Sequence, residues 1–263
     1  MEKVILDHIG LNDAYFKKLI QTNEEVLPFL LKEICGIEVE FKDIQMLNVE
    51  SISEVSLKTS RFDINIKVNN TRIDIENEKI SKGNDDYYLN RKFFYLAKLH
   101  SNSYAVGERY NETKKSVVIF IYNFDMGNVN FISEYHMVNR RENKESDILK
   151  VYDVNLAKIK ENATIELERL FDLLKSKDIT NYIKDSNSMI RGVANMLNTY
   201  DKDEILRLQA EQRDDDLRKY LTEMDWAKSE GKKEVAKKLL ESGMSIEEVS
   251  KMTDLSIEEL KKL

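Results

Sequence analysis

The chain has 263 residues, a net charge of −7, 41% hydrophobic residues and 34% charged residues. This length suits one domain with an appendage, or two small domains. A chain of this length can bury a hydrophobic core without stabilising disulfides or metal ions. No run of about 18 apolar residues occurs, so we expect no membrane-spanning helix, and the N-terminus lacks the apolar stretch of a signal peptide. The single cysteine, Cys35, excludes an internal disulfide and a Cys-rich zinc site. The composition predicts a cytoplasmic protein with no membrane partner.

The N-terminal region is predicted to be helical. Asn12 and Asp13 can cap a first helix, and a second helix is expected from Val26 to Cys35, ended by Gly36. Residues 38–49 follow as a predicted strand, although their alternation of polar and apolar residues is imperfect.

Residues 61–78 alternate polar and apolar on both sides of Asn69-Asn70, which is typical of a β-hairpin. A two-residue loop and a four-residue loop at this pair both predict that Asp63 lies opposite Glu76. One face of the hairpin is apolar and must meet a core. The other face carries only polar and charged side chains: Arg61, Asp63, Asn65, Lys67, Arg72, Asp74, Glu76 and Glu78.

The predicted register brings the Cβ atoms of Asp63 and Glu76 to roughly 5 Å from each other. Two like charges so placed are destabilising unless something neutralises them. A hard cation such as Mg²⁺, which takes oxygen ligands from one or two carboxylates, would do so. Alternatively, the pair is part of an ordinary solvated strand face, as in many antiparallel hairpins.

The next predicted element is a helix from Asp85 to Ser103, with Arg91, Lys92 and Lys98 on a basic side. Beside the carboxylates this side predicts a surface that contacts phosphate, although a solvated helix face has the same pattern. Residues 116–122 are almost continuously apolar, which indicates a strand buried on both faces. Shorter strands are expected at 130–138 and 150–156, joined by a polar loop from 139 to 147. Helices are predicted at about 164–175, 178–198 and 202–242.

The last third of the chain is densely charged. The long helix at 202–242 suggests self-association, and Trp226 is expected to pack in a helix interface. Ser245 and Ser256, each followed three residues later by Glu, predict two capped short helices. A DNA-reading helix-turn-helix has this form, but residues 245–263 hold five acids against three lysines. The charge therefore favours a packing or oligomerisation module.

These elements, in this order, resemble the recombination-promoting nuclease (transposase) family of the PD-(D/E)XK nuclease superfamily. The matching elements are an early Asp-x-x-Phe-Lys-like segment at 12–18, Arg-x-Asp at 61–63, Ile-Glu-x-Gln at 75–78, Arg-x-x-x-Tyr at 91–95, Gly-x-x-Tyr at 107–110 and the tail at 230–256. The resemblance spans nearly the whole chain and rests on order and spacing rather than on one motif. It implies an α/β fold with a restriction-endonuclease-like mixed sheet flanked by helices and an all-helical C-terminal extension.

The resemblance also implies metal-dependent hydrolysis of DNA phosphodiester bonds. Asp63 and Glu76 would hold Mg²⁺, or Mn²⁺ in its place, with the backbone carbonyl of Asn77 as a third ligand. DNA contacts are expected from the residues Arg91, Lys92, Tyr95 and Lys98.

At the third catalytic position this chain has Glu78 where the superfamily usually has Lys and the family usually has Gln. An ionised Glu cannot donate a hydrogen bond to the attacking water, but it can act as a general base or ligate a second ion. The alternative is a catalytically weakened or inactive nuclease-fold protein that acts as a DNA-binding or assembly module. The predicted division of the chain is a nuclease-like core at 1–160, helices that pack on it at 161–200, and a helical tail at 201–263. A homodimer contact is predicted for this tail.

Overall fold

A computed structural model describes residues 3–47, 63–79, 81, 83, 85–105, 107–127 and 130–263 of the chain. The chain falls into two compact units, Met1–Arg207 and Leu208–Leu263, each described by itself below. Among the described residues, every helix falls short of the length and apolar character that crossing a bilayer requires.

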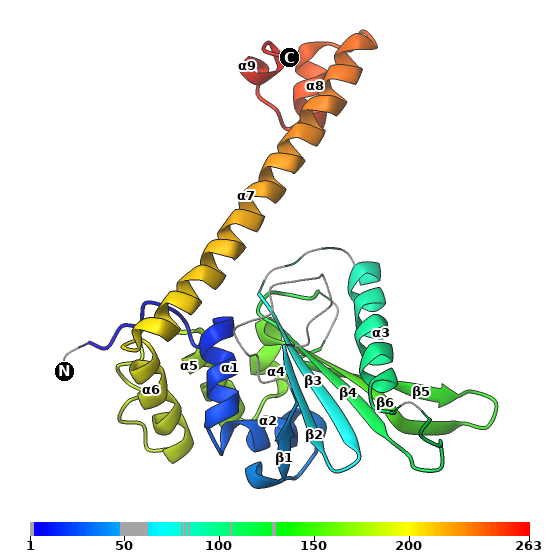
Figure 1. Cartoon of the computed structure of the whole chain (residues 1–263). Helices are drawn as coiled ribbons and strands as arrows, with labels where there is room; N and C mark the ends of the chain where they lie inside the picture. The colour runs from blue at the N-terminus through cyan, green and yellow to red at the C-terminus, as the bar shows by residue number, and fades with distance from the viewer. Residues whose placement is uncertain are drawn as a thin grey trace. The chain divides into compact units, whose positions relative to one another are not determined.

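The first unit is built on a mixed six-stranded sheet with the order β1-β2-β3-β4-β6-β5 (Figure 1). Strands β1 to β3 pair antiparallel, β3, β4 and β6 pair parallel, and β5 pairs antiparallel with β6. The strands are β1 Ile44–Met46, β2 Ile64–Val68, β3 Thr71–Glu78, β4 Lys115–Tyr122, β5 Ile132–Asn139 and β6 Lys144–Asn155.

The helices of this unit lie mostly before and after the sheet in the chain. They are α1 Asp13–Thr22, α2 Val26–Cys35, α3 Asp85–Ser101, α4 Ile159–Asn162, α5 Ile165–Lys175 and α6 Ser188–Tyr200, with 3₁₀ turns η1 Phe41–Asp43 and η2 Leu156–Lys158. Helix α1 packs against α2 and α6, whereas α3 packs on β3, β4 and β6. The predicted α/β class, a mixed sheet flanked by helices with a helical C-terminal region, is confirmed.

The predicted capping of the first two helices is confirmed. The side chain of Asn12 accepts a hydrogen bond from the N–H of Ala14 over 3.0 Å, and Gly36 ends α2 at a φ of 66°. This left-handed conformation is one that glycine adopts without steric cost.

The hairpin register also agrees with the prediction. Val68 pairs with Thr71 and Asn65 with Asp74, so the loop is the two-residue alternative. Asn69 takes a φ of 51°, the left-handed conformation that a tight turn needs. Arg61 and Phe62 lie outside the described residues.

Strand β4 is the buried centre of the sheet, as its apolar sequence predicts. From Ser116 to Tyr122 every residue is buried, because β3 and β6 flank the strand and side chains cover both of its faces. On the side of α3, the buried core consists of Tyr88, Leu96, Leu99, Val118, Phe120, Tyr122 and Val151.

Three predicted element boundaries are wrong. Only Ile44–Met46 of the expected strand 38–49 is a strand, after a 3₁₀ turn, and residues 48 and 49 lie outside the described part. The polar stretch 139–147 is mostly strand, since an exposed edge hairpin accommodates charged residues on both strands. The second helix of the C-terminal series begins at Ser188 rather than at 178, because the backbone at 177–179 bonds the N-terminal segment, with Ile179 N–H donating to the carbonyl of Val4 over 3.0 Å.

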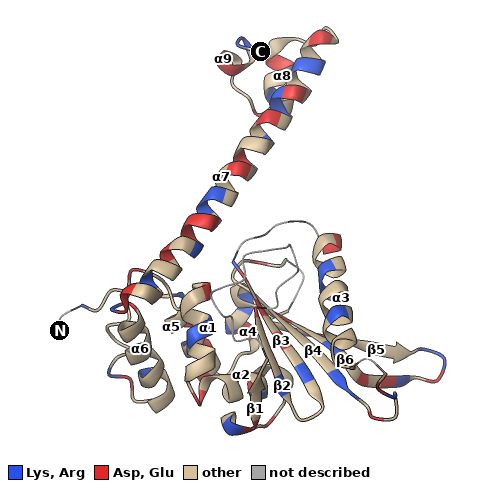
Figure 2. Cartoon of the chain, viewed as in Figure 1, with Lys and Arg blue, Asp and Glu red and all other residues tan. Residues whose placement is uncertain are grey.

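The second unit contains most of α7 Glu204–Glu241, followed by α8 Ile246–Thr253 and α9 Ile257–Leu260. Both predicted capping boxes are present, with Glu248 and Glu259 bonded back to Ser245 and Ser256. A small core joins these helices, with Ala236, Val249, Leu255 and Leu260 buried. Trp226 is 67% exposed, so the prediction that it packs in a helix interface is wrong within this chain. Acidic and basic residues alternate along α7 (Figure 2).

Candidate active site

Two of the predicted carboxylates, Glu76 and Glu78, stand on one face of β3, and that face is buried. Glu76 is 2% exposed and Glu78 is 3% exposed. The opposite face, with Ile73 and Ile75, is buried as well. A face of this kind was expected to be either a solvated surface or a metal site, and the burial under α3 removes the first alternative.

Asp63 and Glu76 form the centre of the site, as the predicted register requires. The backbone N–H of Asp63 donates to Glu76 Oε1 over 3.0 Å, and the N–H of Asn77 donates to Asp63 Oδ2 over 3.3 Å. Burial, followed by the charge of Asp63, raises the pKa of Glu76 to about 8. Burial likewise raises the pKa of Asp63, while Lys17 opposes the shift. The surroundings therefore disfavour the ionised form of both carboxyl groups when no cation is bound.

The backbone of Asn77 faces the same two carboxylates. The carbonyl of Glu78 accepts from the N–H of Asn123, which follows β4, over 2.9 Å. Because successive residues of a strand direct their backbone groups to opposite neighbours, the carbonyl of Asn77 points toward the side of Asp63. Its side chain lies on the other face of β3, where Nδ2 donates to the carbonyl of Leu11 over 2.8 Å.

Two carboxylates and a backbone carbonyl are ligands that a hard divalent cation accepts. Burial disfavours the ionised form of both carboxyl groups and a bound cation would stabilise it, so these residues fit the implied Mg²⁺. Among the described residues, no group of three or more His, Cys, Asp or Glu side chains is placed to hold one ion together.

Arg91 of α3 explains the position of Glu78. Its guanidinium contacts Glu76 Oε2 over 3.1 Å and also pairs with Glu78 Oε1. Tyr95, one turn further along the helix, contacts Arg91 and packs its ring on Phe120. Burial, followed by the charge of Glu76, raises the pKa of Tyr95 to about 12. Arg91 and Tyr95 thus lie next to the carboxylates of the candidate site.

Lys92 points to a second buried cluster that the sequence did not reveal. Its ammonium pairs with Asp153 of β6, which also accepts a hydrogen bond from the hydroxyl of Tyr122 over 3.2 Å. Lys92 is 6% exposed and Asp153 is fully buried. A buried ammonium has no surface to offer a phosphate, so the predicted DNA contact of Lys92 is not supported.

The basic side of α3 therefore lies toward the sheet rather than toward solvent. Arg91 and Lys92 reach carboxylates on β3 and β6, and Lys98 is partly buried. The aromatic residues Phe93 and Phe94 of the same helix are instead each 58% exposed. The buried residues of α3 are spaced three or four apart, as on one face of a helix: Tyr88, Lys92, Leu96 and Leu99. The sequence pattern would have revealed this buried face only if a lysine had been allowed at a core position.

Helix α1 approaches the site from the end of β3. Lys17 Nζ lies 3.7 Å from Asp63 Oδ1, and Lys79 Nζ lies 3.3 Å from Asp13 Oδ1. Asp13 thus does more than begin a helix. Lys79 directly follows the last residue of β3, and its ammonium is paired with Asp13. Lys17 belongs to the segment 12–18 that carries the family resemblance, but no pattern in the sequence assigned it to the site.

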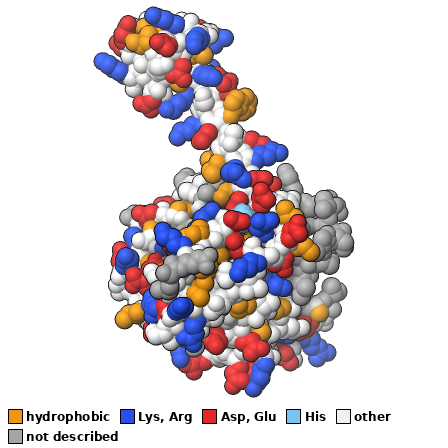
Figure 3. All heavy atoms as spheres, turned by 90° about the vertical axis from the view of Figure 1, so that its left-hand side faces the viewer, with side chains coloured by type: hydrophobic (Ala, Val, Ile, Leu, Met, Phe, Trp, Pro, Cys, Tyr) orange, Lys and Arg blue, Asp and Glu red, His pale blue; other side chains and the backbone are white. Residues whose placement is uncertain are grey.

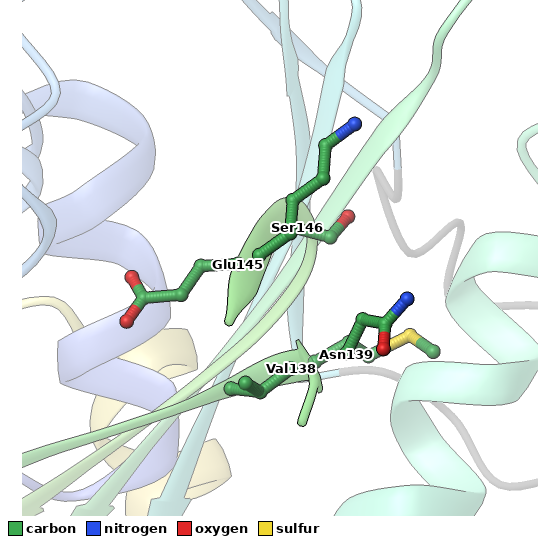
Figure 4. A pocket seen from close by; sticks show the side chains of 6 residues that line it. Val138, Asn139, Glu145 and Ser146 are labelled. Atoms are coloured by element: carbon green, nitrogen blue, oxygen red, sulfur yellow. The ribbon is translucent and has the colours of Figure 1, made fainter. Parts of the chain in front are cut away.

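A pocket elsewhere on the sheet takes no part in this site. It lies on the β5–β6 hairpin (Figure 4) and is lined by Met137, Val138, Asn139, Lys144, Glu145 and Ser146.

Comparison with known families agrees with this geometry. Residues 10–230 match the family model described as PD-(D/E)XK nuclease family transposase, and the fold is that of PD-(D/E)XK nucleases. The match covers most of the chain. The chain belongs to the PD-(D/E)XK nuclease family of transposases. Searches among curated proteins and among solved structures gave no match.

Residues 229–263 match the model described as Rpn/YhgA-like nuclease family, C-terminal HTH domain. The tail thus matches a helix-turn-helix domain, the form that its two capping boxes indicated, and its contact with DNA stays a proposal. Two of its five acids, Glu248 and Glu259, are engaged in capping boxes, where they satisfy backbone N–H groups at helix N-termini. Asp254, another of the five acids, forms the left-handed end of α8 and lies 3.2 Å from Lys232.

Proposed function

We propose that this chain is a Mg²⁺-dependent DNA endonuclease that hydrolyses phosphodiester bonds, with Mn²⁺ as an alternative ion. The observation that carries the proposal is the Asp63–Glu76 pair, two adjacent carboxyl groups with raised pKa values at the end of β3. The family match and the helix-turn-helix domain support DNA as the substrate. Self-association and a cytoplasmic location stay predictions from the sequence.

Asp63 and Glu76 would hold the cation, with the carbonyl of Asn77 as a third ligand. When bound, the ion lowers the pKa of a coordinated water and stabilises charge on the phosphate. Arg91 fixes the Glu76 carboxylate by its contact with Oε2, which keeps that side chain in one orientation. Arg91, Tyr95 and the partly exposed Lys98 are proposed to lie along the DNA backbone, where sequence-independent contacts need only charge and hydrogen bonds.

One face of the molecule shows how its surface charges are distributed. On the face shown in Figure 3, basic and acidic side chains are interspersed rather than gathered into a basic stripe. Nonspecific affinity relies on clustered Lys and Arg that displace counterions. The proposal therefore assigns DNA capture mainly to the helix-turn-helix domain.

Plasmid cleavage tests the proposal. The parent should nick or linearise DNA with Mg²⁺ or Mn²⁺ and not with EDTA, and Asp63→Ala and Glu76→Ala should lower the rate at least about 100-fold. Asp147→Ala is the matched control, since Asp147 is an exposed carboxylate paired with Lys115. Equal cutting by Asp63→Ala, Glu76→Ala and the parent would remove the site assignment.

A second candidate, a catalytically silent DNA-binding or assembly protein, is favoured by one observation. Arg91 pairs with both Glu76 and Glu78, and so already neutralises part of the site without a metal. Calorimetry with Mg²⁺ and Mn²⁺ separates the two candidates. Binding of Mg²⁺ or Mn²⁺ by the parent that disappears in Glu76→Ala supports the nuclease. A parent that binds DNA but neither metal ion supports the silent protein.

A further inference from the structure

The proposed reaction needs positive charge at the scissile phosphate beyond that of the ion, and β3 does not provide it. The third motif position holds Glu78 rather than Lys. Lys79 follows the last residue of β3, and its charge is paired with Asp13. The positive charge of Arg91 is already paired with the carboxylates of Glu76 and Glu78. Since charge stabilisation of the transition state is a large contribution to such catalysis, another cation is required.

Lys17 of α1 is in the position to be that cation. Its ammonium lies 3.7 Å from Asp63 Oδ1, and its side chain is 20% exposed, so solvent and substrate can reach it. The lysine stem has four rotatable bonds, which allow the charge to move by several ångströms toward a phosphate oxygen.

Helix α1 is fixed firmly enough to define this position. Tyr15 and Phe16 are 0% and 1% exposed, so the residues directly before Lys17 are part of the core. The loop before the helix is joined to β3, because Asn77 Nδ2 donates to the carbonyl of Leu11 over 2.8 Å. The same residue whose backbone faces Asp63 thus anchors the helix that carries Lys17.

We propose that Lys17 supplies, from α1, the positive charge that the scissile phosphate needs and that no residue of β3 offers. The inference rests on the proposed function and assigns the phosphate-contacting cation of that same site. In the ion-free protein Lys17 neutralises Asp63. With substrate beside Asp63, its ammonium donates a hydrogen bond to a phosphate oxygen.

The test compares Lys17→Met and Lys17→Arg with Lys79→Met, which removes a similar lysine from a pair with α1. Calorimetry with Mn²⁺ alone and plasmid cleavage with Mn²⁺ are measured for each, after thermal unfolding has shown that each folds. Lys17→Met should bind Mn²⁺ about fivefold more tightly, because a charge that repels the ion about 4 Å from Asp63 is gone. It should nevertheless cut about 100-fold more slowly. Lys17→Arg should cut within about tenfold of the parent, and Lys79→Met within about threefold.

Opposite changes in affinity and rate separate this role from a structural one, since a distorted site would lose both. Parent-like cutting by Lys17→Met, or weakened Mn²⁺ binding, overturns the proposal. If the parent binds Mn²⁺ but cuts no DNA, the proposed function fails. The role of Lys17 is then judged from the Mn²⁺ affinities of the parent and of Lys17→Met. Tighter binding by Lys17→Met then keeps Lys17 as the charge at Asp63, and unchanged binding removes it.

Discussion

Asp74 lies two residues before Glu76 on the same face of β3, and neither of its buried carboxylate oxygens receives a hydrogen bond from the described residues. Burial, followed by the charges of Glu76 and Asp63, raises the pKa of Asp74 well above its usual range. We expect this unsatisfied buried carboxylate to lower the stability of the folded protein.

Asp74→Asn is therefore expected to stabilise the metal-free protein. The pKa of Asp74 is higher in the folded protein than in the unfolded chain. At pH values above the unfolded pKa, the unfolded chain therefore ionises more readily, and the free energy of unfolding falls as the pH rises. Below about pH 4 both states are protonated and the substitution has little effect. Near pH 8 the gain should reach roughly 1–3 kcal/mol, the usual cost of an unpaired buried polar group.

Urea unfolding at several pH values from 5 to 8 checks this. Asp147→Asn is the control, because Asp147 pairs with Lys115, which lowers its pKa and gives the opposite sign. A gain for Asp74→Asn that stays constant or shrinks with rising pH contradicts the expectation.

Alternation along the chain was enough to predict the hairpin, its register and the approach of Asp63 to Glu76, since these are local relationships with a period of two. It could not show that α3 covers the polar face. Arg91 and Lys92 have the composition of a solvated helix side, and their partners lie on separate strands, 61 residues away in the case of Lys92 and Asp153. A charged residue is buried only when a partner is present, and sequence spacing does not bring such partners together.

The pair of Lys92 and Asp153 predicts a specific pattern of stability. Lys92→Met should cost about 3–5 kcal/mol, because it leaves a buried carboxylate uncompensated. The double variant Lys92→Met/Asp153→Leu should recover most of that loss, since apolar residues often replace a buried pair without penalty. Denaturant unfolding of the single and double variants measures the difference.

The exposed pair Lys115–Asp147 provides the comparison. Its side chains are 41% and 60% exposed, so Lys115→Met should change stability by less than about 1 kcal/mol. If Lys92→Met has an equally small effect, the cluster around Asp153 does not carry the stability assigned to it.

Glu78→Gln should preserve folding and increase DNA cutting. Glutamine keeps the shape of the side chain, continues to accept a hydrogen bond from Arg91 and removes one negative charge that repels phosphate. Glu78→Lys should instead lose stability, because it sets a second cation against Arg91 in a buried position. Plasmid cleavage and thermal unfolding of both variants test this, and slower cutting by Glu78→Gln would indicate that the carboxylate itself takes part in the reaction.

Helix α7 carries the prediction of self-association. Leu217, Leu221 and Met224 follow the spacing of four and three residues that forms the seam of a coiled coil, and the last two are 39% and 41% exposed. A second copy of the chain could cover this seam. Leu221→Glu with Met224→Glu should therefore shift a dimer to monomer in light scattering, whereas Thr222→Glu, on another side of α7, should not. A parent that is monomeric at every concentration, or an unchanged dimer in the double variant, would exclude this seam as the contact.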